Sequence, residues 1–369
     1  MTPTDVPVRA PRLRHALEEL GDQGAPAILV TRMVNIRYLT GFTGSAALLL
    51  VLPDGLLFVT DGRYGDQAAE ELGRAGVEAR IEVALTQGGQ KDAVVQAAGD
   101  LPRVALEAGS VTWAQQRRFA AEWFEHSELV ATEGLVEGLR RVKDDGEQAR
   151  LAEAARIADE ALAAVRPMLA EEPTEEEVAI ALDFEMRRRG APGPSFETIV
   201  ASGPNGAKPH ARPGPRRIVE GDLVVVDFGA LYDGYCSDMT RTFCIGEPAS
   251  ETARRMLEVV AASQQAGVAA VSAGVQVAEV DEACRTLIAD AGWGDAFLHG
   301  TGHGVGLEIH EAPRVSYSSD DRLEAGHVVT VEPGVYLPEH GGVRIEDTVV
   351  VTPDGCRPLT NAPKDCLVS

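Results

Sequence analysis

The sequence lacks the features that would place it in a membrane or on nucleic acid. Its longest apolar runs, such as residues 46–52, are far shorter than the roughly 20 residues needed to cross a bilayer. Lys and Arg number 34 against 57 Asp and Glu, so a net charge of −23 would repel nucleic acid phosphates and anionic lipids. The first twenty residues carry charges where a signal peptide has an apolar stretch. We therefore expect a cytoplasmic protein with neither nucleic acid nor membrane as a partner.

Cysteine is scarce and shows no pairing pattern. The five cysteines are odd in number and have no C-x-x-C spacing, which disfavours a disulfide framework and a zinc ribbon. The HExxH motif of single-zinc peptidases, the GxSxG motif of serine hydrolases and the GxGxxG loop of nucleotide-binding folds are also absent. Serine and single-zinc mechanisms and a phosphate cradle are therefore disfavoured.

The length of 369 residues exceeds the range in which one core keeps growing, so we expect two domains. Residues 1–134 alternate apolar runs with amphipathic segments, which is typical of an α/β domain. The step Pro53-Asp54-Gly55 between two apolar runs predicts an antiparallel hairpin. A charged segment at 132–145 then marks the boundary to a second domain, residues 135–369.

The second domain combines helical periodicity with strand-like runs. A long helix is expected up to about Pro167, and a second from Thr174, which has capping-box spacing to Glu177. Further helices are predicted at 250–272 and 276–291, between apolar runs rich in β-branched residues. This pattern predicts an α+β domain with antiparallel hairpins.

Two aspartates stand close together in a strand-like stretch. Asp227 interrupts an apolar run, and Asp238 follows 11 positions later. A turn at Tyr232-Asp233 would set the two directly opposite, and a turn at Asp233-Gly234 would set them diagonally. Either turn places both carboxylates on one face, where they repel unless a cation neutralises them. We therefore favour metal ligation over a strand-ending aspartate and a solvated one.

A glycine-rich stretch carries three histidines, His299, His303 and His310, and five of the eight histidines fall between residues 299 and 340. A lone histidine there would be a structural or surface residue. Three of them, with glycines that allow close backbone approach, indicate a functional site.

Two glutamates repeat the theme of an acid inside an apolar run. Glu332 and Glu346 flank Gly341-Gly342, which is expected to supply the turn between them. The hairpin register stays open, so the sequence does not say which residues face each other. Alternation puts Arg344 on the face of Glu346, and an ion pair between them competes with metal ligation.

Four carboxylates and one imidazole describe a hard, oxygen-rich site. Such a set can hold two divalent ions, as in hydrolytic aminopeptidases. Mn²⁺ or Co²⁺ suits these ligands better than Zn²⁺, although Zn²⁺ could also occupy the site.

Five residues, in their order along the chain and in their local contexts, resemble the metal ligands of the pita-bread metallopeptidases: Asp227, Asp238, His303, Glu332 and Glu346. The segment PSFETIVASGPNGAKPHA, ending at His210, and NIRYLTGF in the first domain are similar to the M24B branch that contains prolidase and aminopeptidase P. The resemblance spans nearly the whole chain. It implies a creatinase-like N-terminal domain, a pita-bread catalytic domain and a homodimer.

The resemblance also implies roles for individual residues. Asp227 would bind one metal and His303 with Glu332 the other, while Asp238 and Glu346 would bridge both. Glu332 would accept the proton of an activated water, and His210 and His310 would be catalytic histidines. The substrate-binding candidates are His299, Arg314, Arg344, Phe196 and Tyr38.

The expected reaction is hydrolysis of the imide bond in Xaa-Pro, most simply as an Xaa-Pro dipeptidase (prolidase). Arg314 matches an arginine that grips the dipeptide carboxylate in some prolidases, although it could equally be a solvated loop residue, because the insertion of longer prolidases after His310 is lacking. The alternative within the class is an aminopeptidase P acting on longer peptides. From other classes, a metal-free binding module of the same fold and a creatinase-like amidinohydrolase remain.

Overall fold

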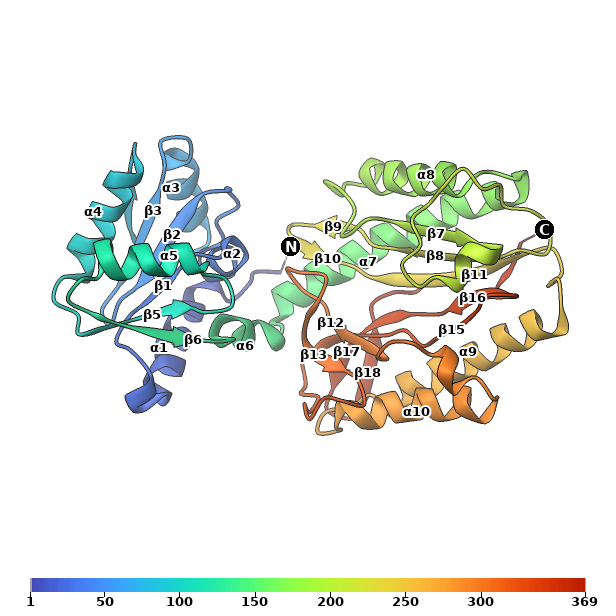
Figure 1. Cartoon of the computed structure of the whole chain (residues 1–369). Coiled ribbons are helices and arrows are strands. Elements are labelled where there is room, and N and C mark those ends of the chain that lie inside the picture. The colour runs from blue at the N-terminus through green and yellow to red at the C-terminus, as the bar shows by residue number, and fades with distance from the viewer. Residues whose placement is uncertain (1, 369) are drawn as a thin grey trace. The chain divides into compact units, whose positions relative to one another are not determined.

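The computed structural model describes residues 2–368, which divide into two compact units (Figure 1). The first unit contains residues 4–140, and the second contains residues 2–3 and 141–368. The junction falls at the end of helix α6 (Leu135–Arg141), within the charged segment where the sequence indicates a domain boundary.

The first unit is an α/β domain built on one six-stranded sheet with the order β4-β3-β2-β1-β5-β6. Strands β1, β5 and β6 run parallel, as do β3 and β4, whereas β1-β2-β3 is antiparallel. The β2–β3 connection is the predicted hairpin at residues 53–55. The strands are β1 Ile28–Val30, β2 Ala47–Val51, β3 Leu56–Thr60, β4 Arg80–Val83, β5 Arg103–Glu107 and β6 Glu128–Thr132.

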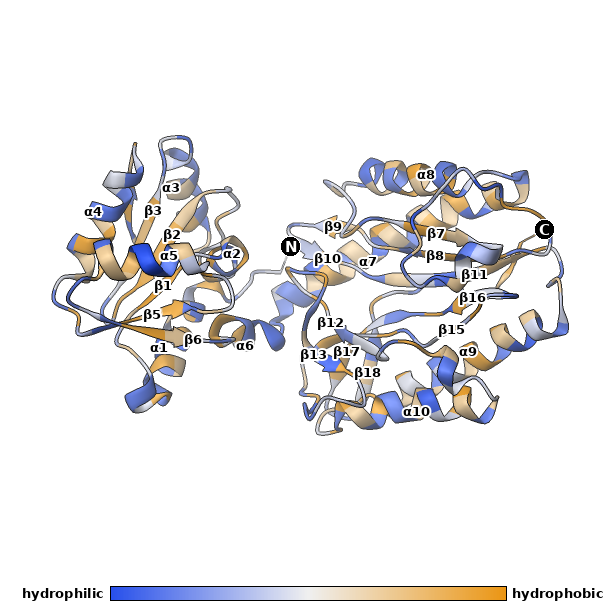
Figure 2. Cartoon of the chain, in the orientation of Figure 1, coloured by the Kyte–Doolittle hydropathy of each residue, from blue (hydrophilic) through white to orange (hydrophobic). Residues whose placement is uncertain are grey.

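Helices surround this sheet and bury an apolar core that includes Leu29, Val59 and Phe119. Apolar residues gather on the strands, and the helices carry both hydrophilic and apolar residues (Figure 2). Besides α6 the helices are α1 Val6–Glu19, α2 Met33–Thr40, α3 Gly65–Arg74, α4 Gln87–Ala98 and α5 Trp113–Arg118, with a 3-10 turn η1 Gly21–Gln23 and a π turn η2 Phe119–Trp123.

The second unit is α+β and consists of two similar halves, each with a helix pair on the outside of its strands (Figure 1). The first half has the sheet β19-β11-β8-β7, and the second has β13-β12-β14-β17-β18. The first half contains α7 Asp145–Val165, α8 Glu175–Arg188, β7 Ile199–Ser202, β8 Leu223–Phe228, β11 Met239–Ile245 and the C-terminal β19 Leu367–Val368. The second half contains α9 Glu251–Ala270, α10 Val277–Asp290, β12 Gly302–Gly304, β13 Glu311–Val315, β14 Val328–Val331, β17 Asp347–Thr352 and β18 Gly355–Pro358.

Two short hairpins and three 3-10 turns complete this unit. The hairpins are β9 Leu231–Tyr232 with β10 Tyr235–Cys236, and β15 Gly334–Leu337 with β16 Gly341–Arg344. The turns are η3 Arg166–Glu171, η4 Gly203–Ala207 and η5 Gly294–Ala296.

The helix predictions for this unit are confirmed. Thr174 and Glu177 form the expected reciprocal capping box at the start of α8. Ser250 caps α9 by accepting from the backbone N–H of Ala253, and α10 lies within the predicted range 276–291. Polar caps satisfy the first backbone donors of a helix, which is why its start can be read from the sequence.

Strand alternation decides which side chains face the centre of the unit. In β8, Val224, Val226 and Phe228 pack into the core beneath α7 and α8, so Asp227 points to the opposite face. In the second half, Val329 and Val331 of β14 pack with α9 and α10. The acids of both halves are thereby turned away from the helix layers.

Within residues 2–368, no helix combines the length and the apolar character needed to cross a membrane.

Candidate metal centre

The two aspartates are joined by a hairpin whose turn is Asp233-Gly234. Tyr232 pairs with Tyr235, and both turn residues have positive φ, 45° and 80°, as a two-residue type I′ turn requires. The same register continues into β8 and β11, where Asp227 faces Thr240. Asp238 is therefore diagonal to Asp227. This confirms the second predicted alternative, and the turn at Tyr232-Asp233 is wrong because it would not place glycine where positive φ is needed.

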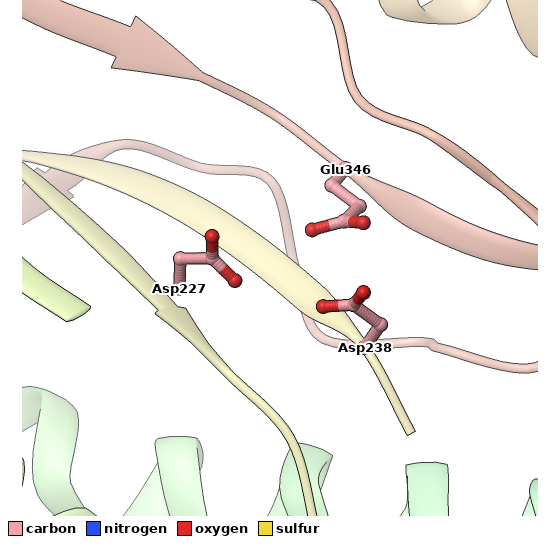
Figure 3. Close-up of side chains that lie close together, drawn as sticks. All are labelled: Asp227, Asp238 and Glu346. Atoms are coloured by element: carbon pink, nitrogen blue, oxygen red, sulfur yellow. The ribbon is translucent and has the colours of Figure 1, made fainter. Parts of the chain in front are cut away.

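Three carboxylates meet at one point. Each of Asp227, Asp238 and Glu346 offers an oxygen, and these atoms all lie within 4.8 Å of one another. Figure 3 shows Asp227 on β8, Asp238 beside the start of β11 and Glu346 between β16 and β17, with their carboxylates turned toward a common centre. Segments more than a hundred residues apart thus contribute to one cluster.

His303 and Glu332 adjoin this cluster. The Nε2 atom of His303 lies 3.5 Å from Oδ2 of Asp238 and 3.4 Å from Oε1 of Glu332. Its Nδ1 donates to the carbonyl of Gly304 at 3.0 Å, and burial lowers the pKa of His303 to about 4. At neutral pH the imidazole therefore presents a bare Nε2 lone pair to two carboxylates.

Glycines on both sides of His303 let its strand fit between two neighbours. A Cβ on Gly302 would overlap the carbonyl of Thr330, and one on Gly304 would overlap the carbonyl of Ala312. The close approach expected from the glycine-rich sequence is confirmed.

Full ionisation of the clustered carboxyl groups is unfavourable without a bound cation. Burial, reinforced by neighbouring carboxylates, raises the pKa of Asp238 and of Glu346 well above their usual values. Burial also raises the pKa of Glu332 to about 8. Ionised carboxylates at this density need a compensating positive charge.

The residues fit divalent cations. Within residues 2–368, Oδ1 of Asp227 and Oε1 of Glu346 are buried with no hydrogen-bond partner, which is costly unless something else binds them. Two ligand atoms each about 2.1 Å from one ion and about 110° apart are about 3.4 Å from each other, which is the spacing of His303 from its carboxylates. The donor set, four carboxylates and one imidazole, suits hard or borderline divalent metals.

A series of hydrogen-bonded, largely buried side chains begins at Asp227. Arg344 pairs with Asp227 at 2.5 Å and donates to the hydroxyl of Tyr336 at 2.7 Å. His299 donates from Nδ1 to Gly300, so its Nε2 accepts from the Tyr336 hydroxyl at 2.8 Å. The ion-pair partner of Arg344 is thus Asp227 rather than Glu346. Sequence reasoning missed Tyr336, although it lies an even number of positions from Glu332.

His310 and Arg314 lie beside the cluster on its exposed side. The rings of His303 and His310 are 4.3 Å apart, centre to centre. Arg314 of β13 lies opposite His303 of β12 in the strand register. Burial and the charges of Arg314 and His210 lower the pKa of His310. The exposed side chains of His210, His310 and Arg314 are thus within electrostatic reach of one another.

The two remaining substrate-binding candidates have different surroundings. Phe196 is half-buried just before β7, next to Ser195, which hydrogen-bonds to carbonyls of Ala230 and Ser237 in the aspartate hairpin. Tyr38 belongs to the first unit, where it is 2% exposed, lies under the guanidinium of Arg9 and donates to the carbonyl of Leu139. We therefore do not include Tyr38 in the proposed site.

The prediction that Gly341-Gly342 forms a turn is wrong. Both glycines belong to β16, and the turn is residues 338–340, because Leu337 pairs with Gly341. A Cβ on Gly342 would overlap the carbonyl of Gly206 in η4. These glycines serve close approach of two backbones rather than a change of direction.

Residues 149–353 match the metallopeptidase family M24, and residues 12–142 match the creatinase/prolidase N-terminal domain. The chain therefore belongs to the metallopeptidase family M24, with the expected creatinase-like domain before a pita-bread catalytic domain. This membership implies the use of divalent metal ions.

Similar proteins within this family carry the names Xaa-Pro dipeptidase and X-Pro aminopeptidase. The chain is 34% identical over 356 residues to an Xaa-Pro dipeptidase of Pyrococcus furiosus, covering 96% of this chain and 99% of the relative. The solved Xaa-Pro dipeptidase of Bacillus anthracis has 38% identity and a TM-score of 0.91, covering 99% of this chain and 100% of that one. The X-Pro aminopeptidase of Thermotoga maritima has 33% identity and a TM-score of 0.87, covering 96% of this chain and 100% of that one.

Proposed function

We propose that this protein hydrolyses the imide bond that precedes proline at the second position of a peptide, with Xaa-Pro dipeptides as its main substrates. The observation that carries the proposal is the neutral His303, whose bare Nε2 faces Asp238 and Glu332 beside two buried carboxylate oxygens without partners. Relatives named Xaa-Pro dipeptidase, aligned over nearly their whole length, support the substrate class.

In this proposal five residues hold two divalent ions, with Mn²⁺ or Co²⁺ preferred. When bound, the ions would polarise the scissile carbonyl and lower the pKa of a nucleophilic water. The five ligands are Asp227, Asp238, His303, Glu332 and Glu346. Because Asp238 and Glu346 are the most buried of the carboxylates, we assign them the bridging roles.

The chain's own groups would move the proton and bind the oxyanion. Burial raises the pKa of Glu332 to about 8 in the metal-free chain, so its carboxylate is a stronger base than that of an ordinary glutamate. Once bound cations had displaced that proton, the Glu332 carboxylate would take the proton from the attacking water. His310, whose ring lies beside that of His303, or His210, which is within electrostatic reach of His310, would donate a hydrogen bond to the developing oxyanion. The leaving nitrogen of proline would then receive the proton. Proline has no N–H, so peptidases that grip an extended backbone through that group handle it badly.

A second candidate within the class is aminopeptidase P, which acts on longer Xaa-Pro peptides. It is supported by the Thermotoga maritima relative. By resemblance to the family we also propose a homodimer.

The test compares an Xaa-Pro dipeptide with an Xaa-Pro-Xaa tripeptide on metal-free protein reconstituted with Mn²⁺ or Co²⁺. We expect cleavage of the dipeptide with a higher kcat/KM than of the tripeptide, and loss of both activities in a chelator. A higher kcat/KM for the tripeptide selects aminopeptidase P. Fully metal-loaded protein that cleaves neither peptide would overturn the proposal.

A further inference from the structure

The candidate ligands come from two separate halves of the second unit. Asp227 and Asp238 belong to the hairpin of the first half, whereas His303, Glu332 and Glu346 belong to the second half. Strand β11, which follows Asp238, and β17, which follows Glu346, lie in different sheets. The distance between Asp238 and Glu346 therefore depends on whatever joins these two strands.

The hydroxyl of Thr348 in β17 donates to the carbonyl of Asp238 at 2.8 Å, and three consecutive residues of β11 make the other bonds of that join. Thr240 donates to Oε2 of Glu346 at 2.8 Å, and its carbonyl accepts from the backbone N–H of Glu346 at 3.1 Å. Thr242 donates to the carbonyl of Arg344 and accepts from the N–H of the same residue, at 2.8 and 3.0 Å. Arg241 lies between them. We call Thr240-Arg241-Thr242 the seam.

Arg241 is the centre of the seam and is 2% exposed. Its three nitrogens donate five hydrogen bonds, which go to the carbonyls of Thr240, Glu346 and Ala362 and to Oδ1 of Asp347. A buried guanidinium is tolerated only when it is fully paired, and its planar fork holds several acceptors in one fixed geometry. One side chain thus fixes the backbone on either side of the cluster.

Asp347 connects the seam to the rest of the unit. Besides Arg241, it accepts from Gln264 of α9 at 3.0 Å and from Thr360 at 3.1 Å, and it pairs with Lys364. The backbone of Glu346 is therefore held by Arg241 and its carboxylate by Thr240, and Arg241 also belongs to the network that holds the next residue, Asp347.

We propose that Arg241 is a positioning residue that sets the affinity of the site for divalent cations by fixing Glu346 relative to Asp238. The inference rests on the metal centre of the proposed function but not on its substrate. A ligand set held at its binding spacing before the ion arrives loses no free energy in assembling, so loosening the seam weakens cation binding.

The test measures binding of Co²⁺ to metal-free protein by calorimetry, together with the visible absorption of the bound ion. Arg241→Met removes the fork at similar volume, and Asp347 keeps Lys364 as its charge partner. The matched control is Arg166→Met, because Arg166 also donates to backbone carbonyls of the C-terminal segment, at Asp365 and Leu367, but not to β17. All measurements are made well below the unfolding temperature of each variant.

We expect Arg241→Met to raise the Kd for Co²⁺ at least tenfold and to alter the absorption spectrum, with Arg241→Lys intermediate. Arg166→Met should stay within about threefold of the parent protein. A folded Arg241→Met variant with the parent Kd and spectrum would overturn the inference.

A second pair of variants covers the case in which Arg241→Met does not fold. Thr242→Val removes the hydroxyl that bonds Arg344, and Thr242→Ser retains it. Weaker Co²⁺ binding in the valine variant alone supports the seam, and equal binding in both overturns it.

The outcomes also separate the inference from the proposed function. A parent protein that binds Co²⁺ but cleaves no Xaa-Pro peptide contradicts only the function. Failure of the parent to bind any divalent ion removes both.

Discussion

Glu332 and Glu346 lie directly opposite each other, since the pairs Val331 with Asp347 and Gly334 with Arg344 bracket them in one continuous register. Their backbone N–H groups do not bond across this pair. That of Glu332 donates to the carbonyl of Thr301, and that of Glu346 to the carbonyl of Thr240. The two backbones therefore separate at the glutamates. Glu332 bonds to the residue before β12, which carries His303, and Glu346 bonds to β11, which follows Asp238.

The carboxylate of Asp238 lies within 4.8 Å of those of Asp227 and Glu346, and Asp238→Asn should abolish activity. The amide has one oxygen fewer to offer, so a role that bridges two cations cannot be filled. We expect kcat to fall at least about a thousandfold and the metal content per chain to drop, measured by peptide hydrolysis and elemental analysis. Near-native turnover would remove Asp238 from the bridging role.

The control for this variant lies in the same hairpin. Asp233 is at its turn with φ of 45°, a conformation that asparagine adopts readily. Asp233→Asn should therefore leave metal content and kcat within about twofold of the parent protein.

Metal-free protein should become less stable between pH 6.5 and 8. The pKa of Glu332 is about 8 in the folded chain against 4.5 for an ordinary glutamate, so over this range the folded state retains a proton that the unfolded state has lost. The contribution of Glu332 to stability is fully present below pH 4.5 and is lost as the pH rises through 8. His299 and His303, with pKa values lowered to about 4, act in the opposite direction, but only below their ordinary value of 6.5.

Urea unfolding of chelator-treated protein at the two pH values measures this effect. One retained proton corresponds to a loss of about 2 kcal/mol over 1.5 pH units. Glu332→Gln should reduce the dependence, and the remainder comes from Asp238 and Glu346, whose pKa values are also raised. Saturating Mn²⁺ should reverse the sign of the dependence, because the ions bind deprotonated ligands. Stability of the metal-free parent that rises across this window would contradict the assignment.

How far the sequence predicts this site depends on how local the determining interaction is. The Asp233-Gly234 turn fixes the register of the first hairpin through two residues with positive φ, and Thr174 with Glu177 marks the start of α8. Both signals lie within four residues, so they could be read directly.

The second half could not be read in this way. The register of Glu332 and Glu346 is visible only once it is known that their backbones turn to other strands. Gly341-Gly342 has the composition of a turn, but the reason for these glycines is the carbonyl of Gly206, which is 136 residues away from Gly342. Tyr336 and the seam likewise act through partners that only the fold brings near.

Arg314 discriminates between the two candidate substrates. If it binds the carboxylate of a dipeptide, Arg314→Ala should raise KM for Xaa-Pro at least tenfold and leave KM for Xaa-Pro-Xaa within about twofold. Arg322→Ala is the control, because Arg322 is also exposed but donates to the carbonyl of Gly274. Equal effects of Arg314→Ala on both peptides would contradict a carboxylate-binding role.

The contact between β16 and η4 should control the segment that carries His210. A methyl group at residue 342 would overlap the carbonyl of Gly206, so Gly342→Ala must displace η4, which ends three residues before His210. We expect a loss of about 1–3 kcal/mol in stability and at least a tenfold fall in kcat, with metal content unchanged, because Glu346 lies beyond the end of β16 and is held there by Thr240. Gly355→Ala is the matched control, since a Cβ there meets nothing within 4 Å. If Gly342→Ala lowers stability but keeps the parent kcat, the position of His210 does not depend on this contact.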